Sequence, residues 1–153
     1  MKMKAKGKKS EDGMMTPSNI YKQLDHVFNF THDIACTTKN CLSPFGVFYD
    51  KKDDALKQSW ASWRCFCNPP FSGKADWIRK AHEEVQNGGC PIVVMVLPKN
   101  SMDSPPWHDY IYGRYHYQII KGRVSFIDPK TKKPKKGNNS GTTIVFFMKK
   151  VVR

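Results

Sequence analysis

The sequence predicts an α/β fold, a three-layer sandwich with an antiparallel strand or a hairpin at one side of the sheet. Two observations point to it: apolar runs of strand length at Cys65–Cys67 and Ile92–Leu97 are separated by a segment with helical spacing, and strand-like segments without helices between them follow toward the C terminus. The 153 residues suffice for one core and are too few for two domains of ordinary size.

The N-terminal part of the chain divides into a tail and the start of the domain. Residues 1–15 are rich in lysine and lack apolar periodicity, so we expect a basic, disordered tail, with a single domain over 16–153. Thr16 followed by Pro17 is typical of an N-cap and the first residue of a helix, here of about ten residues. The alternating segment Phe28–Thr31 then predicts a short strand.

Acidic residues follow the next predicted strand, Val47–Tyr49. These are Asp50, Asp53 and Asp54. A carboxylate at a strand end suits the ribose hydroxyls or the ammonium group of a cofactor, and the alternative is a solvated surface acid.

The middle of the chain predicts a helix and a buried strand. Ser72 is the expected N-cap of a helix that runs to about Gln86, where Asn87–Gly89 ends it. The continuous apolar run within Pro91–Leu97 is typical of a strand covered on both faces.

The C-terminal third predicts mainly strands. Trp107–Ile111 starts a short helix, and Tyr115–Ile120 and Arg123–Ile127 are expected as strands joined by a turn at Lys121 and Gly122. Thr142–Met148 is expected as the last strand.

The charge of the chain predicts a polyanionic partner. Lysine and arginine number 26 against 13 acidic residues, which gives a formal net charge of +13. We expect DNA, because each neutralised phosphate releases counterions. The run Lys130–Lys136 is open to two interpretations, a solvated face or a nucleic-acid contact.

The five cysteines indicate neither zinc nor a disulfide framework. Their number is odd, and there is no CxxC pair and no HExxH, so we expect no metal. No signal peptide and no long apolar span is present, which predicts a cytoplasmic protein with buried thiols and no membrane partner. The oligomeric state stays open.

The segment Asn68–Phe71 carries the chemistry. It follows the strand Cys65–Cys67, and ligands of open α/β sheets bind outside the carboxyl ends of strands. The Asn68 side-chain oxygen and the Pro69 carbonyl can each accept one hydrogen of an exocyclic amine, which turns the nitrogen lone pair toward an electrophilic methyl group. Pro69 and Pro70 restrict the backbone. Phe71 is expected to stack on an everted base. The alternative is a turn with an aromatic ring packed behind it.

This chain resembles the phage-type DNA N-6-adenine methyltransferase family across most of Thr16–Phe147. The segments that carry the resemblance, in the family's order, are Thr16-Pro17, Leu24-Asp25 with Phe28–Thr31, Asp33–Cys36, Asp54–Trp60, Phe66–Ser72, Trp77–Ala81 and Lys121–Arg123. The resemblance implies a Rossmann-like methyltransferase fold, S-adenosylmethionine as methyl donor, and adenine in DNA as acceptor. Host-cell cytoplasm is then the expected location.

The resemblance also implies roles for single residues. Asn68, Pro69, Pro70 and Phe71 are catalytic and hold the base. The cofactor candidates are Asp33, Thr16, Pro17, Ala35 and Asp54. Lys121 and Arg123 are expected to contact the DNA backbone, although a solvated strand residue is an equal alternative for Arg123.

The chain departs from the family at three places. It has no Gly-x-Gly loop after the first strand, Phe71 stands where Tyr is commoner, and His32 stands where the family usually has an apolar residue. Alternative functions are amino-cytosine (N4) methylation, methylation of a glutamine side-chain amide, which the charge disfavours, and a non-catalytic nucleic-acid-binding module on the same fold. The target sequence is not predicted, but we expect the loops Pro98–Pro106 and Asp128–Gly141 to supply recognition.

Overall fold

A computed structural model describes residues 13–36, 42 and 54–150 of the chain. The predicted strand Val47–Tyr49, with Asp50 and Asp53, lies outside the described residues. The helices and strands are α1 Ser18–Phe28, β1 His32–Asp33, β2 Arg64–Cys67, α2 Lys74–Gln86, β3 Ile92–Pro98, β4 His116–Ile119 and β5 Thr142–Phe147, with a π-helical turn at Trp107–Ile111.

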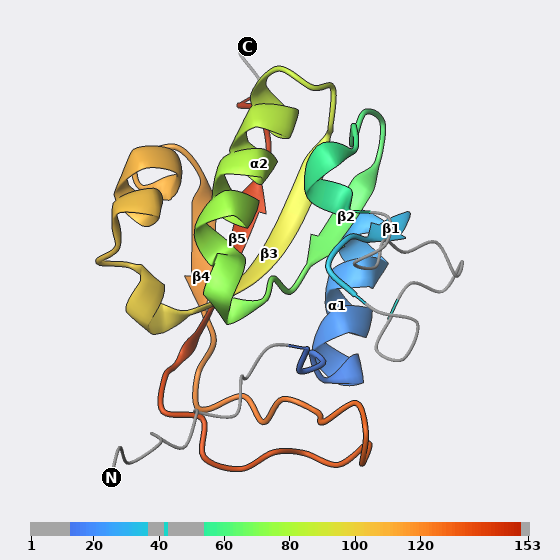
Figure 1. Ribbon diagram of the computed structural model, residues 1–153, viewed down its shortest axis with the longest axis vertical. Coiled ribbons are helices and arrows are strands. Elements are labelled where there is room, and N and C mark those ends of the chain that lie inside the picture. Colours follow the sequence, from blue (N-terminus) through green and yellow to red (C-terminus); the bar gives the residue numbers. More distant parts are fainter. Residues whose placement is uncertain (1–12, 37–41, 43–53, 151–153) are drawn as a thin grey trace, which may run out of the picture.

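The described strands form one mixed sheet with the order β1-β2-β3-β5-β4 (Figure 1). Strands β1, β2 and β3 are parallel, whereas β5 runs antiparallel to β3 and β4 runs antiparallel to β5. The predicted α/β class with antiparallel strands at one side is therefore confirmed. The carboxyl ends of β1, β2 and β3 all lie at one edge of the sheet.

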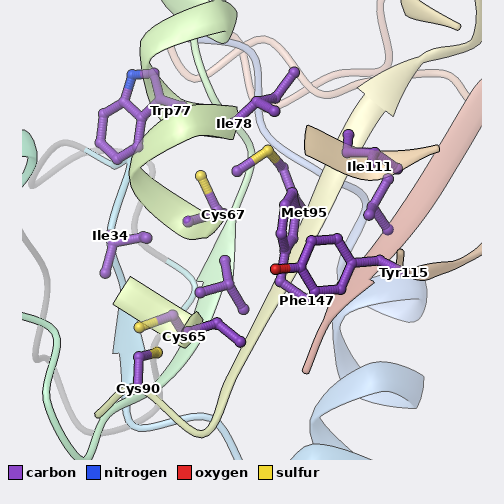
Figure 2. Close-up of a cluster of buried hydrophobic side chains, with 14 of the residues drawn as sticks. Ile34, Cys65, Cys67, Trp77, Ile78, Cys90, Met95, Ile111, Tyr115 and Phe147 are labelled. Atoms are coloured by element: carbon purple, nitrogen blue, oxygen red, sulfur yellow. The ribbon is translucent and has the colours of Figure 1, made fainter. Parts of the chain in front are cut away.

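The core has one cluster on each face of the sheet, because alternate residues of β3 point to opposite sides. One cluster joins β3 to α2 and includes Ile78, Ala81, Val93, Met95 and Leu97; Figure 2 shows Ile78 and Met95 within it. The other joins β3 to α1 and includes Tyr21, Phe66, Ile92, Val94 and Val96. This two-sided burial explains why the β3 sequence is a continuous apolar run.

Helix α2 begins later than the sequence predicts. A 3-10 turn, Phe71–Gly73, precedes it, and Gly73 rather than Ser72 occupies the N-cap position without a side-chain hydrogen bond. The backbone at Pro70 is extended, and the chain turns through a hydrogen bond from the Gly73 N–H to the Pro70 carbonyl at 3.2 Å. The predicted Ser72 cap was therefore wrong, while the predicted end at Gln86 is confirmed.

Two predictions near the N terminus were also wrong in detail. Pro17 is the N-cap residue of α1, so Thr16 precedes the cap and makes no capping hydrogen bond. The predicted strand at Phe28–Thr31 is not formed, because Phe28 ends α1, where its ring packs 5.5 Å from that of Phe146 between centroids. Asn29 reverses the chain with φ 50°, and β1 starts only at His32.

The segment of residues 121–141 connects β4 to β5 and extends below the sheet in Figure 1. The predicted strand Arg123–Ile127 is wrong: only isolated bridges join Ile127 to Met15 and to Pro134. The segment lies beyond the sheet edge, where no strand of the sheet is available as a partner. We call it the basic ribbon. No helix in the described ranges is long and apolar enough to cross a membrane.

Candidate functional site

Asn68 lies directly after the carboxyl end of β2, in the middle of the three parallel strands. The side chains of Cys65, Phe66 and Cys67 are buried in the two core clusters, and this burial holds the strand that precedes Asn68 in place. The pKa of the Cys65 and Cys67 thiols is raised, chiefly by burial, so both are neutral packing groups at neutral pH. The predicted location of the motif at a strand end is confirmed.

The side-chain amide of Asn68 is oriented by the N-terminal segment. Its Nδ2 donates a hydrogen bond to the Met14 carbonyl at 2.9 Å. Because a carbonyl can only accept, this bond assigns the amide nitrogen to that side and leaves Oδ1 on the other. No donor in the described part of the chain is bonded to Oδ1, so the side chain presents a fixed acceptor oxygen.

Met14 is itself held by the basic ribbon. The neighbouring Met15 exchanges two backbone hydrogen bonds with Ile127, each 2.9 Å long. Residues 13–15 belong to the predicted disordered tail, but Met14 and Met15 are bonded into the fold in this way, whereas residues 1–12 lie outside the described ranges. The orientation of Asn68 thus depends on a contact between two segments far apart in the sequence.

The two prolines and the phenylalanine form the rest of the motif. Pro69 is buried, and Pro70 is extended with φ −61° and ψ 138°. Phe71 is half-buried and begins the 3-10 turn. The motif is therefore an extended, proline-restricted segment that ends in a partly accessible ring.

A pocket opens beside this motif. Three segments line it: Gly13 and Met14; Asn68, Pro69 and Phe71; and Phe126, Lys135, Lys136, Gly137 and Asn138. Pro70 is not part of the lining. No motif in the sequence identifies Met14, Phe126, Lys135, Lys136 or Asn138 individually as site residues. Two expectations covered part of this lining, the basic run Lys130–Lys136 and the recognition loop Asp128–Gly141, but the place of both depends on the fold of the basic ribbon.

Asp33, the first cofactor candidate, lies at the carboxyl end of β1, where it is in register with Phe66 of β2. Its side chain is buried, and Oδ2 accepts a hydrogen bond from the Leu42 N–H at 2.9 Å. Burial raises its pKa to about 6, against the lowering effect of hydrogen bonds from Leu42, Ala35 and Cys36. The register with Phe66 puts Asp33 beside the end of β2, and its charge contributes to the raised pKa of Cys67.

The other cofactor candidates lie in three places. Thr16 is buried next to the segment that holds Asn68, its hydroxyl has no hydrogen-bond partner in the described ranges, and Pro17 follows it at the N-cap. Ala35 packs against the core cluster on the α2 side. Asp54 forms an ion pair with Lys57 at 3.1 Å and makes no contact with Asp33 or Thr16 that the described residues record.

Lys121 and Arg123 are exposed at the start of the basic ribbon. Neither lines the pocket, so the structure does not bring them to Asn68. The four described cysteines form no disulfide with one another, and among the described residues no group of three potential ligands is arranged to hold a metal ion.

Comparisons with known proteins identify the family of this chain. The family model for DNA N-6-adenine-methyltransferase (Dam) matches residues 4–152. The chain is also 23% identical over 150 residues to the DNA N-6-adenine-methyltransferase of Haemophilus phage HP1, covering 96% of this chain and 85% of that protein. Because the family match spans nearly the whole chain and includes the Asn68–Phe71 segment, this chain belongs to the DNA N-6-adenine-methyltransferase (Dam) family.

Proposed function

We propose that this protein is a Rossmann-like methyltransferase that moves a methyl group from S-adenosylmethionine to the N6 amine of adenine in DNA. Family membership supports the reaction class, and the orientation of Asn68 is the observation that carries the proposal for this chain. The amide nitrogen of Asn68 donates its hydrogen bond to the Met14 carbonyl, so Oδ1 remains available to accept a hydrogen bond from an incoming amine.

The residues of the motif have distinct tasks in this proposal. Oδ1 of Asn68 and the carbonyl of Pro69 each accept one amine hydrogen, which directs the nitrogen lone pair away from the purine ring. The fixed backbone of the prolines holds both acceptors before the base arrives, so little reorganisation is needed. Phe71 stacks on the everted base and offsets part of its unstacking cost, which is a few kcal/mol.

The residues beside the motif fit the proposed cofactor. Thr16 has a buried hydroxyl without a partner in the described ranges, and Asp33 has a buried carboxyl whose pKa is raised to about 6. Both groups suit hydroxyl or ammonium groups of a nucleoside amino-acid ligand, with Pro17 and Ala35 beside them. When bound, S-adenosylmethionine supplies an electrophilic methyl group on a sulfonium.

Asp54 has a weaker claim to this site. Its carboxylate forms an ion pair with Lys57, and it stays a candidate only through the resemblance. The change Asp54→Asn is therefore expected to weaken donor binding less than Asp33→Asn, as measured by calorimetry.

The test is transfer of label from S-adenosylmethionine to duplex DNA, followed by digestion and separation of the nucleosides. We expect label on N6-methyladenine, and transfer slower by about 10²–10³-fold with Asn68→Ala. Label on cytosine alone would reassign the activity to N4 methylation. If the protein binds DNA but gives no heat with S-adenosylmethionine, it is a non-catalytic module instead.

A further inference from the structure

The basic ribbon, residues 121–141, has a strongly uneven charge. It contains seven basic residues, Lys121, Arg123, Lys130, Lys132, Lys133, Lys135 and Lys136, and a single acidic one, Asp128. All seven basic side chains are exposed. The proposed function assigns no role to Lys130, Lys132, Lys133, Lys135 or Lys136.

The ribbon has a defined conformation of its own. Its two arms are joined by hydrogen bonds from the Lys135 N–H to the Phe126 carbonyl at 2.8 Å and from Asn138 Nδ2 to the Val124 carbonyl at 3.1 Å. At its tip, Oδ1 of Asp128 accepts hydrogen bonds from the N–H groups of Lys130 and Thr131, at 2.8 and 3.4 Å. The single carboxylate of the ribbon, that of Asp128, is therefore bonded to the backbone of the tip.

The ribbon is also joined to the sheet and to the catalytic motif. The Lys99 N–H donates to the Gly141 carbonyl at 2.7 Å, at the carboxyl end of β3. On the other arm, Ile127 holds Met15, and the adjacent Met14 holds Asn68. Through these bonds Phe126, Lys135 and Lys136 reach the same pocket as Asn68 and Phe71.

We infer that the basic ribbon is the wall of this pocket that receives the DNA strand carrying the target base. Lys135 and Lys136 bind backbone phosphates next to the everted nucleotide, and Phe126 provides apolar contact for the nucleotide inside the pocket. This inference rests on the proposed function, which it deepens by naming the contacts that bring the strand to Asn68. No carboxylate in the described ranges is paired with Lys135 or Lys136, so both are available for phosphate.

The charge of these lysines has a measurable consequence. Each phosphate contact contributes about −0.9 to the slope of log affinity against log salt on duplex DNA. Loss of both contacts is expected to reduce the magnitude of this slope by about 1.8. If Lys135 and Lys136 bind no phosphate, replacing them leaves the slope unchanged.

The chain offers a matched control at the opposite end of the sheet. Lys149 and Lys150 are exposed and follow β5, whose last residues pair with the start of β3, for example Phe147 with Val93. The double variants K135A/K136A and K149A/K150A therefore remove the same charge from opposite ends.

The experiment is fluorescence anisotropy of a labelled mixed-sequence duplex over a range of salt concentrations, with the unaltered full-length protein as reference. We expect K135A/K136A to lose affinity and salt slope, K149A/K150A to retain both, and K135R/K136R to restore them. Thermal unfolding of each variant checks that the fold is intact.

Equal losses in the two alanine variants, or an unchanged slope in K135A/K136A, would overturn the inference. Because this measurement needs no methyl donor, its result is separate from that of the transfer assay. A protein that binds through Lys135 and Lys136 but transfers no label retains the phosphate contacts and loses the proposed function.

Discussion

The two ends of the sheet are both basic, but they differ in the polar groups that accompany the positive charge. At the carboxyl end, Lys135 and Lys136 share a pocket with Asn68. At the amino end, Arg114, Lys149 and Lys150 line a shallow groove with His82, Gln86, Gly113 and Met148. Both ends therefore carry positive charge, but we expect only the carboxyl end to bind DNA.

The difference lies in how the polar groups are used. In the amino-end groove, the Tyr115 hydroxyl bonds to His82 Nδ1 and to Gln86 Nε2, each at 2.8 Å, so these groups satisfy one another. At the carboxyl end, the Asn68 amide is fixed through its nitrogen and its oxygen faces no protein donor in the described ranges. Catalysis needs such a preorganised acceptor, whereas attraction needs only charge.

The largest expected effect of a single change is at Asn68. Replacement by alanine removes one of the two acceptors that we propose for the amine, and an interaction of this kind is worth about 2.7–4 kcal/mol, or about 10²–10³ in kcat. Single-turnover methyl transfer measures it. Affinity for DNA should change little, because phosphate contacts lie elsewhere.

The variant Asn68→Asp is the control for this experiment. It retains an acceptor oxygen but loses the Nδ2 donor to Met14. We expect a smaller loss than in Asn68→Ala. Equal losses in Asn68→Asp and Asn68→Ala would mean that the bond to Met14, which both variants lack, is the essential feature.

At the amino end, a comparable change should reduce stability and leave the chemistry intact. Glu84 accepts hydrogen bonds from Lys80 Nζ at 2.6 Å and from the Trp60 N–H at 2.9 Å, and it is largely buried. Glu84→Ala leaves both donors unpaired and is expected to lower the free energy of unfolding by about 3 kcal/mol.

Urea unfolding measures the effect of Glu84→Ala, with Glu84→Gln as the milder variant because it retains an acceptor for Trp60. The salt slope of DNA binding should equal that of the unaltered protein. A changed slope would show that the amino end takes part in DNA binding.

Asp33→Asn is expected to stabilise the protein at high pH. Burial raises the folded-state pKa to about 6, above about 3.9 for an exposed aspartate, so the folded protein holds a proton that the unfolded chain releases. Stability therefore falls as pH rises from about 4 to about 6, and the full penalty, about 3 kcal/mol at 1.36 kcal/mol per pH unit, is present above that range.

The side-chain amide of the Asp33→Asn variant retains an acceptor for the Leu42 N–H and removes the titration. Urea unfolding at the two ends of this pH range should show a gain only at the higher pH, with the exposed Asp109→Asn as control. Calorimetry should show weaker S-adenosylmethionine binding. A gain in stability with unchanged donor binding would remove Asp33 from the cofactor site.

The smallest effect is expected at Phe71. Phe71→Ala removes a stacking surface worth about 1–3 kcal/mol, which raises KM for DNA. Phe71→Tyr retains the ring face and should be near neutral. Steady-state kinetics at varied DNA concentration measures KM for DNA in both variants. Equal losses in Phe71→Ala and Phe71→Tyr would argue against stacking.

Much of the fold could be predicted from local sequence because the signals there are strong. The continuous apolar run of β3 and the helical spacing of Trp77, Ile78, Ala81 and Val85 leave few alternatives. The errors lie where tertiary contacts override weak local signals: Phe28 stays in α1 to pack on Phe146, and Arg123–Ile127 has no sheet partner.

By itself the sequence determined the composition of the motif and its place, since Asn68, the two prolines and Phe71 are adjacent in the chain and the preceding strand sets their place at the sheet edge. Only the tertiary structure decided which way the Asn68 amide points and which cations share its pocket. Those contacts join Met14, Asn68 and Lys135, and no periodicity or local propensity relates residues so far apart in the chain.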